Sequence, residues 1–205
     1  MIMAKEFLNE AERFLVEHWV EAQLLEESME GVRTKYKEIF QRIIKAVTEA
    51  HPELDANRAI PIQRWSSGEI GFGRKSWPID KYGNPSGFWF GSLLLEKLAA
   101  EDSEDPYASI WVSKKTNLDF DAARAAVNEA AQELLTPEEL KQIFSTESGD
   151  ENLLYLPAPS KRQLLDALFE GDGHKFIELF LAQFDMTARF VPLLDKVFRE
   201  CLKKE

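Results

Sequence analysis

The amino-acid sequence predicts an α+β fold, in which a small antiparallel sheet of about four strands is flanked by long N-terminal and C-terminal helices. A heptad pattern of apolar residues covers residues 1–50, and further helical patterns fill residues 117–203. Between them, residues 58–115 hold four of the five tryptophans and six of the ten glycines, and they alternate with the period of two that is typical of strands. We therefore expect residues 51–205 to form an α+β domain, with residues 1–50 packed on it as part of one unit.

Composition narrows the class of protein. The chain has 205 residues, a formal charge of −11 and one cysteine, which excludes an internal disulfide and a multi-cysteine zinc site. The acidic balance argues against coating of nucleic acid by bulk charge. The N-terminus lacks the apolar core of a signal peptide, and the uncharged stretch Gly83–Leu95 is too short to span a bilayer as a helix. We expect a cytoplasmic protein without membrane contact.

The N-terminal heptad pattern is the most regular feature of the sequence. Of fourteen a- and d-type positions between residues 4 and 50, only His18 is polar, and the pattern passes Gly31 without a skip. A single helix and a helical hairpin that turns at Gly31 both remain open. The a-type positions are Leu8, Leu15, Ala22, Met29, Tyr36, Ile43 and Ala50, and the d-type positions are Ala4, Ala11, His18, Leu25, Val32, Ile39 and Ala46.

The apolar stripe admits two interpretations. Phe7, Phe14 and Trp19 widen it beyond a strict coiled-coil seam, as in helices that pack on their own domain. The alternative is a seam for a partner chain, which would be contacted by Leu8, Ala11, Leu15 and Trp19. Small residues are frequent in the first part of the stripe and bulky ones in the second. We expect the segment after Gly31 to be buried in the domain and the first part to be free for a partner.

The strands and later helices follow from local signals. Pro61 predicts an edge strand because it cannot donate to a ladder, and the apolar run Phe88–Leu95 predicts a central strand. Helices are expected after three capping residues, Asp119 (or Asn117), Thr136 and Ser160. Pro192 should kink or split the last helical pattern. Leu153–Leu156 is a candidate short strand, and Ala108, Ile110 and Val112 alternate with Ser109, Trp111 and Ser113 as a fourth strand of the sheet.

The order of these elements carries a family resemblance. The segments concerned are Tyr36–Phe40, the strands around Trp89 and Trp111, Leu153–Leu156 and Leu164–Leu168. They resemble the non-catalytic C-terminal region of bacterial PD-(D/E)XK nuclease-superfamily proteins. The resemblance implies a bacterial or phage setting and a region that accompanies a nuclease. It implies no catalytic residue, because that region of the family carries none.

Catalytic and metal chemistry finds little support in the sequence. A nuclease site of this superfamily needs an acid and a lysine on one strand face, but Glu96 and Lys97 are adjacent and would point to opposite faces. The three histidines lack the spacing of a zinc pair, and no phosphate-binding glycine loop is present. We expect no cofactor and no metal, and the interpretation leans against an enzyme.

A local basic and aromatic cluster offers a second surface. Its residues are Arg64, Trp65, Arg74, Lys75, Trp77 and Lys81. On a sheet, such residues can stack on bases and hold phosphates. The leading hypothesis is that the protein is a non-enzymatic interaction or adaptor subunit of a bacterial or phage complex. It would bind another protein or form a homo-oligomer. The alternative is a module that binds nucleic acid or a nucleotide through this cluster.

Overall fold

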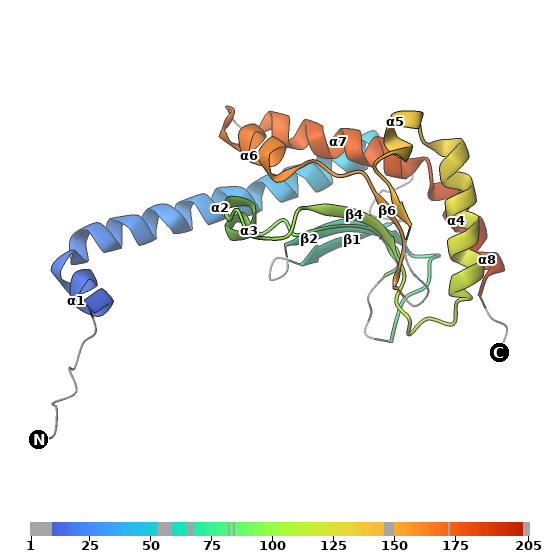
Figure 1. Ribbon diagram of the computed structural model, residues 1–205, viewed down its shortest axis with the longest axis horizontal. Helices are drawn as coiled ribbons and strands as arrows, with labels where there is room; N and C mark the ends of the chain where they lie inside the picture. Colours follow the sequence, from blue (N-terminus) through green and yellow to red (C-terminus); the bar gives the residue numbers. More distant parts are fainter. Residues whose placement is uncertain are drawn as a thin grey trace, which may run out of the picture. The chain divides into compact units, whose positions relative to one another are not determined.

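The computed structural model describes residues 10–52, 59–64, 68–81, 83, 85–145, 150–171 and 173–202, and the side chains of residues 10, 12, 13, 59–64, 144 and 145 are not described. The chain divides into two compact units, Met1–Glu38 and Ile39–Glu205. The division falls inside helix α2 (Trp19–Ala50). Figure 1 shows the elements of the α+β fold. The predicted fold class is confirmed.

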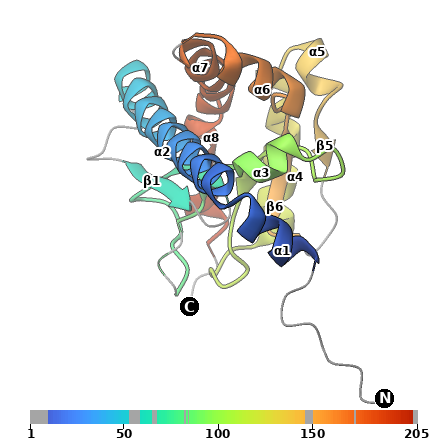
Figure 2. The same ribbon diagram turned by 90° about the vertical axis from the view of Figure 1, so that its left-hand side faces the viewer.

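The N-terminal heptad segment forms two helices. The first, α1, spans Glu10–Glu17, and the second, α2, spans Trp19–Ala50. The chain changes direction at His18 (Figure 2), the polar residue of the heptad pattern. Helix α2 continues through Gly31, where an added Cβ would meet nothing within 4 Å. The continuous helix excludes a hairpin at Gly31. The helical segment is instead interrupted thirteen residues earlier, at His18.

Within the described residues, the sheet contains six antiparallel strands in the order β1-β2-β3-β4-β6-β5. These are β1 (Ala59–Arg64), β2 (Glu69–Arg74), β3 (Gly87–Gly91), β4 (Tyr107–Trp111), β5 (Phe144–Ser145) and β6 (Asn152–Leu156). The strand with Pro61 lies at the edge and β3 lies inside the sheet, as predicted, but β3 ends at Gly91 and does not reach Leu95. Strand β6 confirms the candidate short strand at Leu153–Leu156, and together with β5 it brings the sheet above the expected total of about four strands.

The core lies between one sheet face and two long helices of the second unit. Strand partners place Phe72, Phe88 and Phe90 on that face. The ring of Phe90 contacts those of Phe180 and Phe184 on α7 (His174–Ala188), at centroid distances of 5.9 and 4.8 Å. The ring of Phe40, on the C-terminal half of α2, lies 6.1 Å from that of Phe180. This half of α2 and α7 therefore lie on the same side of the sheet (Figure 1).

Three of the later helices begin at the predicted capping residues. Helix α4 (Phe120–Leu134) is capped by Asp119, and α5 (Pro137–Leu140) and α6 (Lys161–Phe169) begin with capping boxes at Thr136 and Ser160. A short helix, α3, spans Leu95–Ala99. The last pattern is split as expected: α7 ends at Ala188, and α8 (Val191–Glu200) has Pro192 in its first turn.

Candidate functional site

The strongest candidate site is an apolar stripe on α2 that changes from exposed to buried along one helix. We define the seam as its four heptad positions before Tyr36, namely Ala22, Leu25, Met29 and Val32. Leu25, Met29 and Val32 are 63, 47 and 50% exposed, and Ala22 is half-buried. Further along the same face, Tyr36, Ile39 and Ile43 are buried, and Ile43 is fully inaccessible. The burial begins later than expected, since Val32 lies beyond Gly31 and is still exposed.

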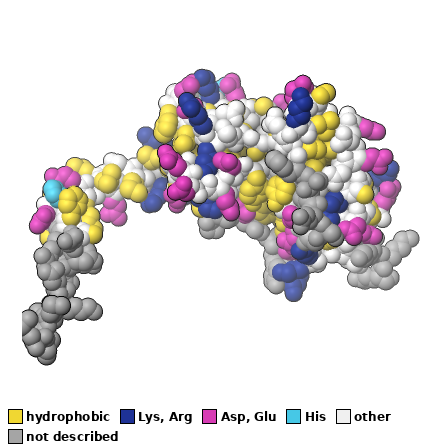
Figure 3. All heavy atoms as spheres, in the orientation of Figure 1, with side chains coloured by type: hydrophobic (Ala, Val, Ile, Leu, Met, Phe, Trp, Pro, Cys, Tyr) yellow, Lys and Arg dark blue, Asp and Glu magenta, His cyan; other side chains and the backbone are white. Residues whose placement is uncertain are grey.

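Of the partner-binding residues predicted from the sequence, Ala11 and Leu15 lie on α1 and Trp19 begins α2. Leu8 lies outside the described residues, whereas Ala11, Leu15 and Trp19 are exposed. The ring of Phe14 lies against that of His18, with centroids 4.4 Å apart. Sequence analysis missed three further exposed apolar residues of the first unit: Val16, Val20 and Leu24. Figure 3 shows hydrophobic side chains on the surface of this segment, with acidic side chains among them.

Burial of this exposed stripe against another surface would be favourable in free energy. Burial of apolar surface contributes about 25 cal/mol per Å², so the seam would gain free energy from any complementary apolar surface. Single exposed apolar residues are normal, but contiguous sets commonly mark contact sites for other molecules. Leu25, Met29 and Val32 recur at the spacing of a helix–helix contact. The arrangement is therefore suited to binding another helix.

The basic and aromatic cluster has a different structure from the one we expected. Trp77 is only 3% exposed, and its ring lies against Phe88 and Phe198 with centroid distances of 5.7 and 5.4 Å. Its indole N–H donates a hydrogen bond of 2.7 Å to Oδ1 of Asp195 on α8. Trp77 belongs to the core and does not offer a ring on which a base could stack. Its assignment to a binding surface was wrong for this physical reason.

Arg74 is engaged by the same carboxylate. Its Nη1 donates to Oδ2 of Asp195 at 2.6 Å, and its side chain is only 16% exposed. A phosphate-binding role would need an accessible guanidinium, but Arg74 is paired with an acid from the other end of the chain. Lys75 and Lys81 lie at the surface. The side chain of Arg64 and all of Trp65 lie outside the described residues.

A second group of aromatic residues occupies the other face of the sheet. Trp89 is buried, and its ring lies 5.1 Å from that of Trp111. The ring of Tyr107 covers Gly91, where an added Cβ would come within 2.3 Å of a ring atom. Burial, helped by the charge of Glu69, raises the pKa of Tyr107 to about 12. These residues pack the second face of the sheet.

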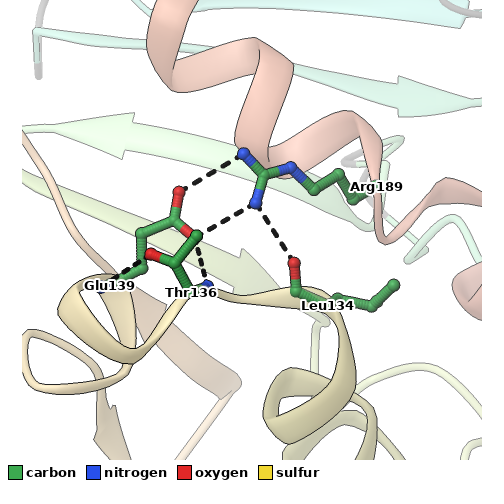
Figure 4. A network of polar contacts seen from close by, with 4 residues as sticks. All are labelled: Leu134, Thr136, Glu139 and Arg189. Atoms are coloured by element: carbon green, nitrogen blue, oxygen red, sulfur yellow. Dashed lines mark hydrogen bonds and ion pairs between the residues drawn. The ribbon is translucent and has the colours of Figure 1, made fainter.

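A polar network joins α5 to the end of α7 (Figure 4). Arg189 donates to both carboxylate oxygens of Glu139, at 3.1 and 3.3 Å, and to the backbone oxygen of Leu134 at 3.1 Å. Glu139 also accepts a 2.7 Å hydrogen bond from the backbone N–H of Thr136. Every member has a structural partner, which indicates a helix-capping and docking role for this network.

The network predicts a pH dependence. Burial by itself would raise the pKa of Glu139, but the hydrogen bonds from the Thr136 backbone and from Arg189 outweigh it, so the pKa lies below its ordinary value of 4.5. A carboxylate with a lowered pKa stabilises the fold at pH values above its ordinary pKa, and this stabilisation is lost as the pH falls through the pKa of the folded state.

We expect Glu139→Gln to lower the free energy of unfolding at pH 7. The difference from the unsubstituted chain should shrink below pH 4.5, as measured by urea unfolding at several pH values. A difference that stays constant down to acid pH would contradict this role of the charge.

We find no metal site elsewhere among the described residues, and the hollow between α6 and α7 is not an enclosed ligand pocket. Among the described residues, no group of three or more His, Cys, Asp or Glu side chains could hold a metal ion. A hollow of about 390 Å³ lies between α6 and α7, with Asp166, Glu170, Lys175 and Glu178 among its lining residues. Within it, Lys175 pairs with Glu170. The hollow is open and lined by ordinary surface charges.

Comparisons with known proteins add no relative to this description. None of the protein-family models, curated proteins or solved structures compared with the chain matches it. Within the described part of the chain, no helix combines the length and the apolar composition that crossing a membrane requires.

Proposed function

We propose that this chain is a non-enzymatic interaction or adaptor subunit of a bacterial or phage protein complex, and that it binds a protein partner through the seam. One observation carries the proposal. The apolar face of α2 is continuous in sequence, but it is exposed from Leu25 to Val32 and buried at Tyr36, Ile39 and Ile43. The exposed part has the heptad spacing of a helix–helix contact. The bacterial or phage setting is supported by the family resemblance of the sequence.

The alternative function, binding of nucleic acid, has less support. Its proposed surface depended on aromatic rings beside basic side chains. Trp77 is buried, and the guanidinium of Arg74 is held by Asp195. Lys75 and Lys81 remain at the surface, but two lysines on an acidic protein make a weak electrostatic site for phosphates. The seam is therefore the better-supported binding surface.

Site-directed photo-crosslinking tests the proposal. A photo-reactive residue at Met29, which is a seam position, should give a defined crosslinked protein in cells that produce the full chain. The same residue at Glu27 is the matched control, since Glu27 is also exposed but lies at the heptad position farthest from the seam. Mass spectrometry of the crosslinked band identifies the partner. Equal crosslinking from both positions, or none from Met29, would contradict a seam-specific partner.

A further inference from the structure

The charges of α2 are divided along its length. From Glu17 to Val32, both included, the sequence has five glutamates and no lysine or arginine. The next five residues include Arg33, Lys35 and Lys37. All five glutamates and the three basic residues are exposed. A partner helix with the reverse order of charges would complement this surface. The same helix, turned end for end, has that order.

We propose that the seam binds a second copy of this chain, with the two α2 helices antiparallel. This inference rests on the proposed function, because it names the partner of the same surface. A two-fold axis midway between Leu25 and Met29 places each of these residues opposite the other in the second copy. The same axis places Ala22 opposite Val32. All four seam residues are thereby covered, and α1 is not needed.

The flanking heptad positions favour the antiparallel orientation. In an antiparallel helix pair, g-type positions face g-type positions and e-type positions face e-type positions, and their charges set partner and orientation. Glu21 and Lys35 are both g-type, so each Glu21 lies beside Lys35 of the second copy. Trp19 is e-type and lies beside Arg33 of the second copy, which permits a cation–π contact. The pair contains each of these contacts twice.

A parallel pair would be less favourable. There, g-type positions face the e-type positions of the next heptad, so Glu21 would lie beside Glu26 of the second copy, and this repulsion would occur twice. The antiparallel pair has a single like-charge contact, between the two copies of Glu26 at the axis, against two Glu21–Lys35 pairs. The balance of charges therefore selects the antiparallel arrangement.

The contact is short, which sets the expected affinity. The seam from Ala22 to Val32 covers roughly 15 Å of helix at about 1.5 Å per residue. Such a contact lies at the small end of protein interfaces, so the dimer is expected to dissociate at roughly micromolar concentration. Its flanking ion pairs are exposed, and salt should weaken it.

Charge reversal tests the partner and the orientation together. Sedimentation equilibrium of the full chain at low salt, over about two orders of magnitude of concentration around the micromolar range, should show a monomer–dimer equilibrium. Glu21→Lys and Lys35→Glu each create two like-charge contacts and should each weaken the dimer by roughly tenfold or more. An equal mixture of the two variants, and the double variant, should restore dimers. Glu27→Lys makes the same charge change away from the seam and should leave the equilibrium unchanged.

The outcomes separate this inference from the proposed function. A chain that stays monomeric over the whole range, or single variants whose mixture does not associate, would overturn the antiparallel dimer. Crosslinking from Met29 to a different protein would also overturn it, while supporting the seam as a binding surface. Absence of any Met29-specific crosslink would overturn both. Circular dichroism of each variant confirms that α2 is retained, since all the substituted positions are exposed.

Discussion

Replacement of Ile43 by aspartate is expected to abolish cooperative folding of the second unit. Ile43 is fully inaccessible and lies on the face of α2 that continues from the seam. Aspartate there would lose the burial of a large aliphatic side chain, about 2–5 kcal/mol. It would also place a carboxylate in the core without a partner, which costs several kcal/mol more. The sum is comparable to the whole stability of a typical domain, about 5–15 kcal/mol. Loss of the thermal unfolding transition is the expected result.

The matched control is Leu25→Asp. Leu25 precedes Ile43 by 18 residues (43 − 25), which is five turns of about 3.6 residues, so both side chains lie on the same side of the helix. Leu25 is 63% exposed, and we expect its substitution to change the free energy of unfolding by about 0.5 kcal/mol or less. Urea unfolding of both variants decides the matter. If Leu25→Asp destabilises the protein as strongly as Ile43→Asp, the seam belongs to a core and is not a binding surface.

This pair also shows what the heptad pattern could and could not predict. The pattern correctly indicated a helix through Gly31 as one of its two options, and it identified the apolar face. It could not indicate where burial begins, because Leu25, Val32 and Ile39 are equally apolar and equally spaced. Burial depends on whether another element covers the face, and sequence periodicity is local. The larger size of the later apolar side chains was the one local indication that exposed positions give way to buried ones. It placed this transition at Gly31, whereas Val32 is still exposed.

The sheet was predictable where its strands follow one another. Strands β1 to β4 pair in chain order, so alternation and turn residues in residues 58–115 were sufficient to find them. The addition of β6 beside β4 depends on pairing across more than 40 residues, which includes Ile110 with Leu154. Leu153–Leu156 was noted as a candidate strand, but nothing local indicated its place in the sheet. The two-residue β5 is too short to show alternation.

The basic cluster failed as a predicted surface for a similar reason. Arg74 is a basic residue near a turn, and such residues are normally in solvent. Its partner, Asp195, lies 121 residues later in the chain, and no local pattern connects the two. The tryptophan count indicated a core as readily as a binding face, and the structure places Trp77 in the core.

The cluster of Arg74, Trp77 and Asp195 predicts a large effect on stability. The carboxylate of Asp195 accepts hydrogen bonds from both other residues, at 2.6 and 2.7 Å, and it links α8 to the end of β2. In Asp195→Ala, the guanidinium of Arg74 would keep its charge while only 16% exposed, with its Nε already lacking a hydrogen-bond partner. Removal of one member of a buried ion pair costs about 3–5 kcal/mol. Because the carboxylate is partly exposed, we expect about 2–3 kcal/mol, measured by urea unfolding.

Two further measurements test whether the cost of Asp195→Ala arises from its pairing with Arg74. Asp166→Ala removes an acid from the exposed helical pair with Arg162, whose atoms are 3.6 Å apart, and should cost about 0.5 kcal/mol or less. In an Arg74→Met background, Asp195→Ala should cost clearly less than it does alone, because no unpaired guanidinium remains buried. If the cost of Asp195→Ala is the same in both backgrounds, the two residues are not coupled. The stabilising role of Asp195 would then lie in its bond to Trp77, and Arg74 would be free to act as a surface cation.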